Sequence, residues 1–107
     1  MSNVIHINTA AFPKAKESGK PVLIDFWAPW CGPCRLQGPI LDQVSQQVGD
    51  RAIVAKVNVD EEPTLASEFG IQSIPTLVVL KGDRVLKRMV GVQQAGTLVG
   101  ALEAAGA

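Results

Sequence analysis

Both cysteines of the chain, Cys31 and Cys34, lie within the segment Trp30–Cys34, directly after a mostly apolar run, Val22–Trp27. If a helix begins at Cys31, the two side chains share one helix face, with Cβ atoms about 5–6 Å apart. That separation allows a disulfide to form after small adjustments, so the pair could open and close reversibly. The spacing therefore predicts a redox centre at a strand-to-helix junction.

The two cysteines are expected to differ in reactivity. The start of a helix carries partial positive charge and unpaired N–H groups, and both favour a thiolate at Cys31 over a thiol. Cys34 lies one turn further into the helix. We expect it to be more deeply buried and to stay a thiol until it is needed.

Two other interpretations of the pair remain open. A structural disulfide would fit the same spacing, although so short a loop constrains the unfolded chain little. A zinc half-site would also contain C-x-x-C, but structural zinc takes four ligands, and the other soft donor, His6, lies far away in the sequence. The flanking strand and helix pattern favours redox chemistry.

The composition predicts one soluble domain that comprises residues 1–107. The chain is 47% hydrophobic and 19% charged, which is enough for one core and excludes disorder. Ten basic and ten acidic residues balance, so nothing favours nucleic acid or a membrane surface. The segment Met1–His6 does not look like a signal peptide, and no apolar run is long enough to span a bilayer. We expect a cytoplasmic protein, since disulfides there are usually transient and catalytic.

The order of elements predicts a mixed sheet between helical layers. Strands are expected over Val4–Ile7, Val22–Trp27, Ile53–Val59, Thr76–Leu80 and Arg84–Val90, and helices after a cap at Asn8 or Thr9, after Cys31, from Pro63 and from Gln94. Helical crossovers produce parallel strands, whereas the turn at Lys81–Asp83 makes an antiparallel hairpin. The fold class is therefore α/β.

The helix after the cysteines is expected to bury one apolar stripe. The spacing places Leu36, Ile40, Leu41, Val44 and Val48 on that stripe. Pro39 should kink the helix, because proline removes a backbone donor. The segment Gly49–Arg51 is expected to break the chain before the next strand.

Over nearly its whole length the chain resembles the thioredoxin family. The motifs that carry the resemblance are Asp25–Ala28, Trp30–Cys34, Pro39, Lys56, Ile74–Thr76 and Gly91. The resemblance implies a five-stranded mixed sheet with about four helices. It also implies a general protein disulfide reductase, an electron carrier of cellular redox homeostasis.

The resemblance implies roles for both cysteines and a source of electrons. Cys31 would attack a substrate disulfide, and Cys34 would resolve the mixed disulfide. An NADPH-dependent flavoprotein, thioredoxin reductase, would reduce the pair again, so the chain itself would bind no cofactor or metal. Substrate proteins would include ribonucleotide reductase, methionine sulfoxide reductase and peroxiredoxins, with no nucleic acid or membrane partner, and the chain would be a monomer.

Asp25 is a single carboxylate in an otherwise apolar strand. Burial disfavours its charged form, so its pKa should be raised. The functional interpretation is proton exchange with Cys34 through water, and the alternative is a tolerated core residue. Lys56, on the neighbouring predicted strand, could modulate Asp25 or could be an ordinary exposed lysine.

The resemblance also implies an apolar surface for substrate docking, with a cis bond between Ile74 and Pro75. That surface would comprise Trp30, Gly32, Pro33, Ile74, Pro75, Gly91 and Val92. Gly91 could instead be a plain turn residue, and Trp27 is expected only to pack below the site. The chain departs from the common family pattern at Pro29, Gln37 and Gly38.

Two rival functions remain open. A thiol oxidase or isomerase could use the same fold, although Gly32–Pro33 between the cysteines is the pair typical of reductases. A docking subunit of a larger complex could use the apolar surface without any redox turnover.

Overall fold

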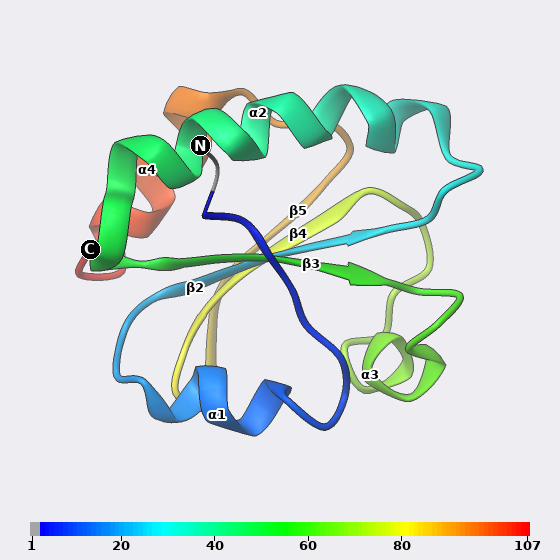
Figure 1. Cartoon of the computed structure of the whole chain (residues 1–107), viewed down its shortest axis with the longest axis horizontal. Helices are drawn as coiled ribbons and strands as arrows, with labels where there is room; N and C mark the ends of the chain where they lie inside the picture. The colour runs from blue at the N-terminus through cyan, green and yellow to red at the C-terminus, as the bar shows by residue number, and fades with distance from the viewer. Residues whose placement is uncertain (1–2) are drawn as a thin grey trace.

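The computed structural model describes residues 3–107 and places five strands in one sheet between two pairs of helices (Figure 1). The strands are β1 (Ile5–His6), β2 (Val22–Trp27), β3 (Ile53–Asn58), β4 (Thr76–Lys81) and β5 (Arg84–Val90). The helices are α1 (Phe12–Glu17), α2 (Gly32–Val48), α3 (Pro63–Glu68) and α4 (Ala95–Ala104), with one 3-10 turn, η1 (Gly49–Arg51). Helices α2 and α4 cover one face of the sheet, and α1 and α3 cover the other.

The sheet is mixed, as the order of elements predicted. Its strand order is β1-β3-β2-β4-β5, in which β1, β3 and β2 run parallel and β4 and β5 run antiparallel to their neighbours. Strand β2 lies at the centre, and Val22, Leu23, Ile24 and Phe26 are fully buried because helices cover both faces. The segment that leaves β2 therefore starts from a rigid strand.

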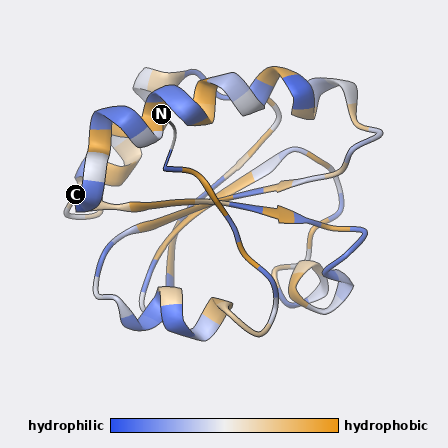
Figure 2. Ribbon diagram, viewed as in Figure 1, coloured by the Kyte–Doolittle hydropathy of each residue, from blue (hydrophilic) through white to orange (hydrophobic). Residues whose placement is uncertain are grey.

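Two hydrophobic clusters, one on each face, hold the layers together. On the α2 and α4 face, Leu23 and Leu77 pack with Leu41 and Leu98. On the other face, Phe26 belongs to a cluster that contains Phe12 and Leu65. Figure 2 shows this arrangement as hydrophobic strands inside helices of mixed character. Because β2 contributes to both clusters, its position is fixed from both sides.

The structure corrects the predicted start of the chain. Strand β1 covers Ile5–His6 rather than Val4–Ile7, and it lies at the edge of the sheet, paired with β3. Helix α1 begins at Phe12, and its N-cap residue, Ala11, has no side-chain cap. The Asn8 carboxamide oxygen instead accepts the Ala11 N–H (2.8 Å), so it closes the turn before the helix. The terminal part of the predicted Met1–His6 segment, residues 1 and 2, lies outside the described residues.

The predicted stripe of α2 is wrong at Leu36, whose side chain is 66% exposed. The buried positions of this helix are Cys34, Gln37, Leu41, Val44, Ser45 and Val48. Each residue turns an α-helix by about 100°, so Leu36 points about 200° away from Cys34. Because Cys34 lies on the same buried stripe as Leu41 and Val44, Leu36 faces outward.

Pro39 does not end α2. It lies inside a helix that continues to Val48, and Gly49–Arg51 forms a 3-10 turn where a plain break was expected.

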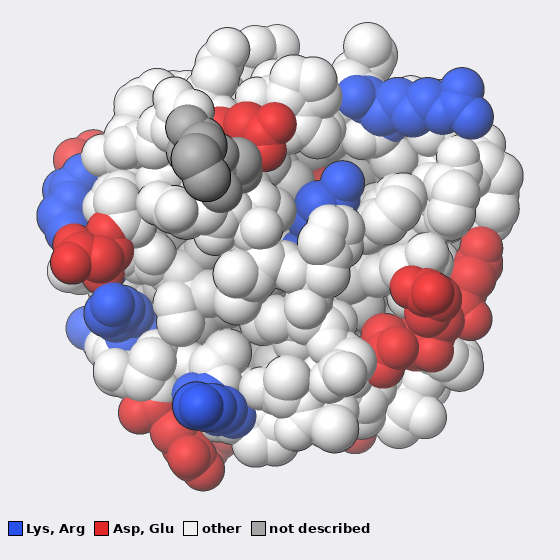
Figure 3. All heavy atoms as spheres, in the orientation of Figure 1, with Lys and Arg blue, Asp and Glu red and all other residues white. Residues whose placement is uncertain are grey.

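Within residues 3–107, no helix combines the length and apolar character needed to cross a membrane. Figure 3 shows basic and acidic side chains scattered over the viewed face, as expected from the balanced composition.

Candidate redox site

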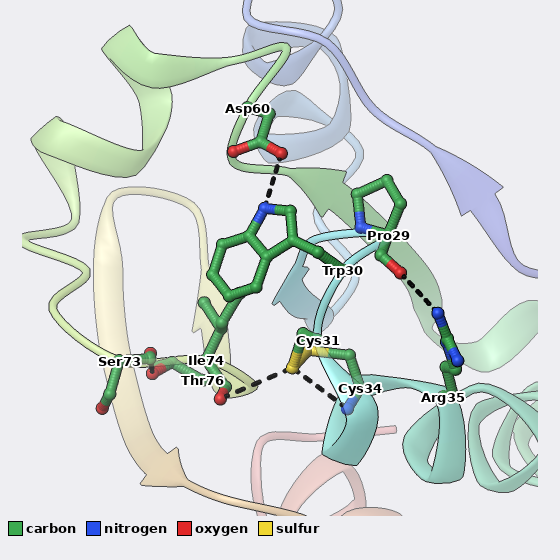
Figure 4. The surroundings of a disulfide bond; sticks show 9 residues. All are labelled: Pro29, Trp30, Cys31, Cys34, Arg35, Asp60, Ser73, Ile74 and Thr76. Carbon is green, nitrogen blue, oxygen red and sulfur yellow. Dashed lines mark hydrogen bonds between the residues drawn. A yellow bond between two sulfur atoms is a disulfide. The ribbon is translucent and has the colours of Figure 1, made fainter.

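The two cysteines form a disulfide where β2 leads into α2 (Figure 4). Their Cα atoms are 5.3 Å apart, within the range that a disulfide requires. Cys31 is the N-cap residue of α2, with an extended backbone, and the helix begins at Gly32. The predicted strand-to-helix location is therefore confirmed, with the first cysteine one position before the helix.

Polar groups surround the sulfur of Cys31. The backbone N–H of Cys34 donates to the Cys31 Sγ (3.2 Å), and the Ile74 carbonyl oxygen lies 3.8 Å from the same sulfur. When the disulfide is open, the N–H and the positive end of the α2 dipole would stabilise a thiolate there. The cysteines are 5% and 3% exposed, so the predicted difference in burial is very small.

The structure gives the zinc interpretation no support. Among residues 3–107, no group of three or more His, Cys, Asp or Glu side chains could hold a metal ion. His6 instead packs edge-on to Trp27, with ring centroids 6.3 Å apart.

Asp25 is fully buried, and within residues 3–107 neither of its carboxylate oxygens has a hydrogen-bond partner. Burial raises its pKa to about 7, and the positive charge of Lys56 acts in the opposite direction. The predicted rise is therefore confirmed. Since side chains alternate along a strand, Asp25 faces the same side as Leu23, which is the side that α2 covers.

Lys56 lies directly opposite Asp25 in the register of β3 with β2. Its Nζ lies 4.3 Å from the centroid of the Trp27 ring. Lys56 also reaches toward α2, the helix that carries Cys34. If Gly38 had a side chain, its Cβ atom would lie 3.9 Å from the Lys56 Nζ. Lys56 is half-buried and held in place, unlike an ordinary exposed lysine.

The loop before β4 approaches the disulfide from one side. Ile74 packs against the small cluster formed by Ala28 and the two cysteines, and its bond to Pro75 is cis, as the resemblance implied. Trp30 is 67% exposed, and its Nε1–H donates to Asp60 (2.9 Å). A groove of about 370 Å³ lies between Trp30 and Ile74 and is lined by Trp30, Val59, Ala66, Ile71, Gln72, Ser73 and Ile74.

Gly91 connects a second loop to this site. Its backbone N–H donates to the Pro75 carbonyl oxygen (2.8 Å), and its φ of +88° lies in the region that favours glycine. Gly91 therefore both makes the turn after β5 and ties that turn to the loop beside Cys31. Val92, the next residue, is half-buried.

The structure brings most of the predicted residues together. Figure 4 shows Trp30, Ile74 and the two cysteines side by side. The residues that sequence reasoning missed are Asp60, the partner of Trp30, and Gln93, which bonds to Gln37. Gln37 stood out only as a polar residue where the family pattern is apolar. No sequence pattern predicted its partner, because 56 positions separate the two glutamines.

Comparisons with known proteins agree with this geometry. A family model described as thioredoxin matches residues 3–104. A thioredoxin of Alicyclobacillus acidocaldarius is 49% identical over 87 residues, which are 81% of this chain and 83% of that protein. Thioredoxin 1 of Synechococcus elongatus is 45% identical over 104 residues, which are 96% and 97% of the two chains. The crystal structure of Malassezia sympodialis thioredoxin superposes with a TM-score of 0.86 at 35% identity, covering 97% of this chain and 91% of that one.

Proposed function

Because the chain belongs to the thioredoxin family and is a disulfide reductase with a C-x-x-C redox pair, we propose that Cys31 is the attacking thiolate and Cys34 the resolving thiol. The observation that carries this assignment is the position of Cys31 at the N-cap of α2, where its sulfur accepts the Cys34 N–H. Cys34 lies inside the first turn and is already next to Cys31.

The reaction then takes two exchanges of sulfur partners. The Cys31 thiolate attacks one sulfur of the substrate disulfide, forming a mixed disulfide and releasing the other substrate sulfur as a thiolate. Cys34, after losing its proton, attacks the Cys31 sulfur and displaces the second substrate thiolate. Two electrons pass to the substrate, and Cys31 and Cys34 remain as a disulfide. The second exchange is fast because its nucleophile is held in place.

We assign to Asp25 the uptake of the Cys34 proton, through water. A pKa of about 7 suits an acid-base group at neutral pH, and no residue of the described part of the chain hydrogen-bonds to either oxygen. Lys56, opposite Asp25 in the sheet, stabilises the charged carboxylate and so modulates this step.

The substrate is proposed to dock on the surface around the disulfide. This docking surface comprises Trp30, Gly32, Pro33, Ile74, Pro75, Gly91 and Val92. Trp30, Gly32 and Pro33 are exposed, and the Ile74 backbone carbonyl lies beside the Cys31 sulfur. An extended segment of a substrate protein could pair with that backbone while its disulfide reaches Cys31.

The electron source and the partners belong to the same proposal. Thioredoxin reductase, a flavoprotein that uses NADPH, would reduce Cys31–Cys34, and ribonucleotide reductase, methionine sulfoxide reductase and peroxiredoxins are candidate substrates. We propose a cytoplasmic monomer in which residues 1–107 act as one domain, since cytoplasmic disulfides are usually transient and catalytic.

Two substitutions test the roles of the cysteines. With a disulfide substrate, Cys34→Ser should stall as a mixed disulfide on Cys31, whereas Cys31→Ser should form no adduct and have no activity. Mass spectrometry detects the adduct, and NADPH consumption with thioredoxin reductase and insulin measures turnover. An adduct on Cys34 in the Cys31→Ser protein would reverse the assignment. A double Cys→Ser variant that still supported a partner's activity would favour the docking subunit.

A further inference from the structure

Gln37 is a fully buried amide on the active-site helix, and both ends of its side chain bond to the backbone of one distant residue. Its Nε2 donates to the Gln93 carbonyl oxygen (3.0 Å), and its Oε1 accepts the Gln93 N–H (2.7 Å). A buried polar side chain is tolerated when its donors and acceptors are satisfied in this way. The paired bonds fix α2 to the turn that follows β5.

The Gln93 side chain extends this connection toward the docking surface. Its amide nitrogen donates to the carbonyl oxygens of Val90 (3.3 Å) and Gly91 (3.2 Å). The Gly91 N–H in turn donates to Pro75 (2.8 Å), whose neighbour Ile74 places its carbonyl oxygen beside the Cys31 sulfur. These contacts connect Gln93 through Gly91 and Pro75 to the backbone beside Cys31, although the three segments are far apart in the sequence.

The connection closes on itself through α2. Gln37 lies three positions after Cys34, on the same side of the helix, and both are buried. The resulting ring of contacts runs in the order Cys31, Ile74–Pro75, Gly91, Gln93, Gln37 and Cys34. Every segment that contributes to the proposed docking surface belongs to this ring. A surface held in one arrangement before the partner arrives loses less conformational freedom on binding.

We propose that Gln37 is a positioning residue that sets the Gly91–Gln93 turn against the active-site helix and so preorganises the surface on which protein substrates dock. The inference rests on the proposed docking role of that surface. It predicts that Gln37 matters for a substrate that needs docking and not for a small disulfide that needs only an accessible thiolate.

The test removes both bonds with Gln37→Met, which nearly conserves volume, and uses Gln43→Met as the matched control at an exposed position of the same helix. Fully reduced proteins react in a stopped-flow instrument with insulin and with 5,5′-dithiobis(2-nitrobenzoate). Since a net hydrogen bond contributes about 0.5–1.5 kcal/mol, Gln37→Met should slow the insulin reaction about twofold to twelvefold. Its rate with the small disulfide should stay unchanged, and the control should match wild type with both reagents.

Amide hydrogen exchange followed by NMR provides the second readout. The Gln93 N–H should exchange faster in Gln37→Met and at the wild-type rate in Gln43→Met. Faster exchange with an unchanged insulin rate would overturn the proposal, because the bonds would then be structural only. Equal slowing with both disulfides would also overturn it, because the thiolate rather than docking would be affected. Unchanged exchange would show that the paired bonds do not hold the turn.

A second variant keeps the proposal testable if Gln37→Met does not fold. Gln93→Ala retains the backbone bonds to Gln37 but removes those to Val90 and Gly91, so the insulin rate should fall about twofold to threefold while the small-disulfide rate stays unchanged. An insulin rate equal to wild type in Gln93→Ala would overturn the proposal that the ring of contacts preorganises the docking surface. A wild-type protein that fails to reduce insulin at all would instead refute the proposed function, and the inference with it.

Discussion

Asp25 of β2 and Gln37 of α2 are both fully buried polar side chains, but their surroundings are opposite. Among the residues that the structure describes, neither Asp25 oxygen has a hydrogen-bond partner, whereas both ends of the Gln37 amide are bonded to Gln93. A buried carboxyl without a hydrogen-bond partner lowers folding stability and has a shifted pKa. A buried amide whose donor and acceptor are both bonded has little net effect on stability and fixes the geometry of its partners. The same depth of burial therefore supports proton transfer in one case and positioning in the other.

The largest effect that follows from this contrast is the pH dependence of Asp25→Asn. The pKa of Asp25 rises from an ordinary 3.8 to about 7 on folding. The stability that the neutral Asp25 carboxyl contributes is fully present below the unfolded pKa of 3.8. It is lost as the pH rises through the folded pKa of about 7. At about 1.4 kcal/mol per pKa unit, wild type should lose about 4 kcal/mol relative to Asp25→Asn between pH 4 and pH 8.

Denaturant unfolding of the oxidised proteins across this pH range provides the measurement. The difference in free energy of unfolding between Asp25→Asn and wild type should grow from pH 4 to pH 7 and then stay level. Asp42→Asn, at an exposed position of α2, serves as the control and should show no such growth. A constant difference would mean that Asp25 does not carry the raised pKa, and its contrast with Gln37 would collapse.

Gln37→Glu should give the converse effect, because it places an ionisable group where the amide is satisfied. A neutral carboxyl could still donate to the Gln93 carbonyl oxygen, but a charged one could not and would face that oxygen directly. Leaving a buried group unsatisfied costs about 1–3 kcal/mol, so the variant should be about 2 kcal/mol less stable at pH 8 than at pH 4, relative to wild type. Unfolding at both pH values measures it, and equal stability would show that water reaches position 37.

Lys56→Met should sharpen the assignment at Asp25 with a smaller effect. The Lys56 charge lowers the Asp25 pKa, so its removal should move the titration of Asp25 to higher pH. Carbon-detected NMR of the Asp25 carboxyl measures the midpoint directly. Lys14→Met, at an exposed position of α1, is the control. An unchanged midpoint of the Asp25 titration in Lys56→Met would mean that Lys56 packs against Trp27 without affecting Asp25.

Local patterns predicted most of the fold and the reactive pair. The i, i+3 spacing of Cys31 and Cys34 after an apolar strand sufficed to predict a disulfide at the start of a helix, which the structure confirms. The polar residue in that strand, Asp25, was likewise predicted to be buried with a raised pKa. These features depend on neighbours in the sequence and on general physics.

Features that depend on distant partners could not be predicted from the residues alone. The bond between Gln37 and Gln93 joins positions 56 apart, and the Trp30–Asp60 bond joins positions 30 apart. The docking residues Ile74 and Gly91 came from the family resemblance, since neither has a local signal that points to Cys31. Sequence patterns specify which face is apolar, but tertiary packing decides which groups meet across the core.

Leu36→Gln should give the smallest effect on stability. It tests the arrangement in which the apolar Leu36 is exposed while the polar residue beside it, Gln37, is buried. Periodicity placed Leu36 in the buried stripe, but the helix buries Cys34 and leaves Leu36 66% exposed, while its polar neighbour Gln37 is fully buried. Substitutions at such surface positions usually change stability by less than about 0.5 kcal/mol, whereas Leu41→Ala in the same helix should cost about 2–5 kcal/mol. Denaturant unfolding of both variants measures the contrast. A loss above about 1 kcal/mol for Leu36→Gln would mean that α2 is rotated so that Leu36 is buried, and the Gln37 bonds would then not form.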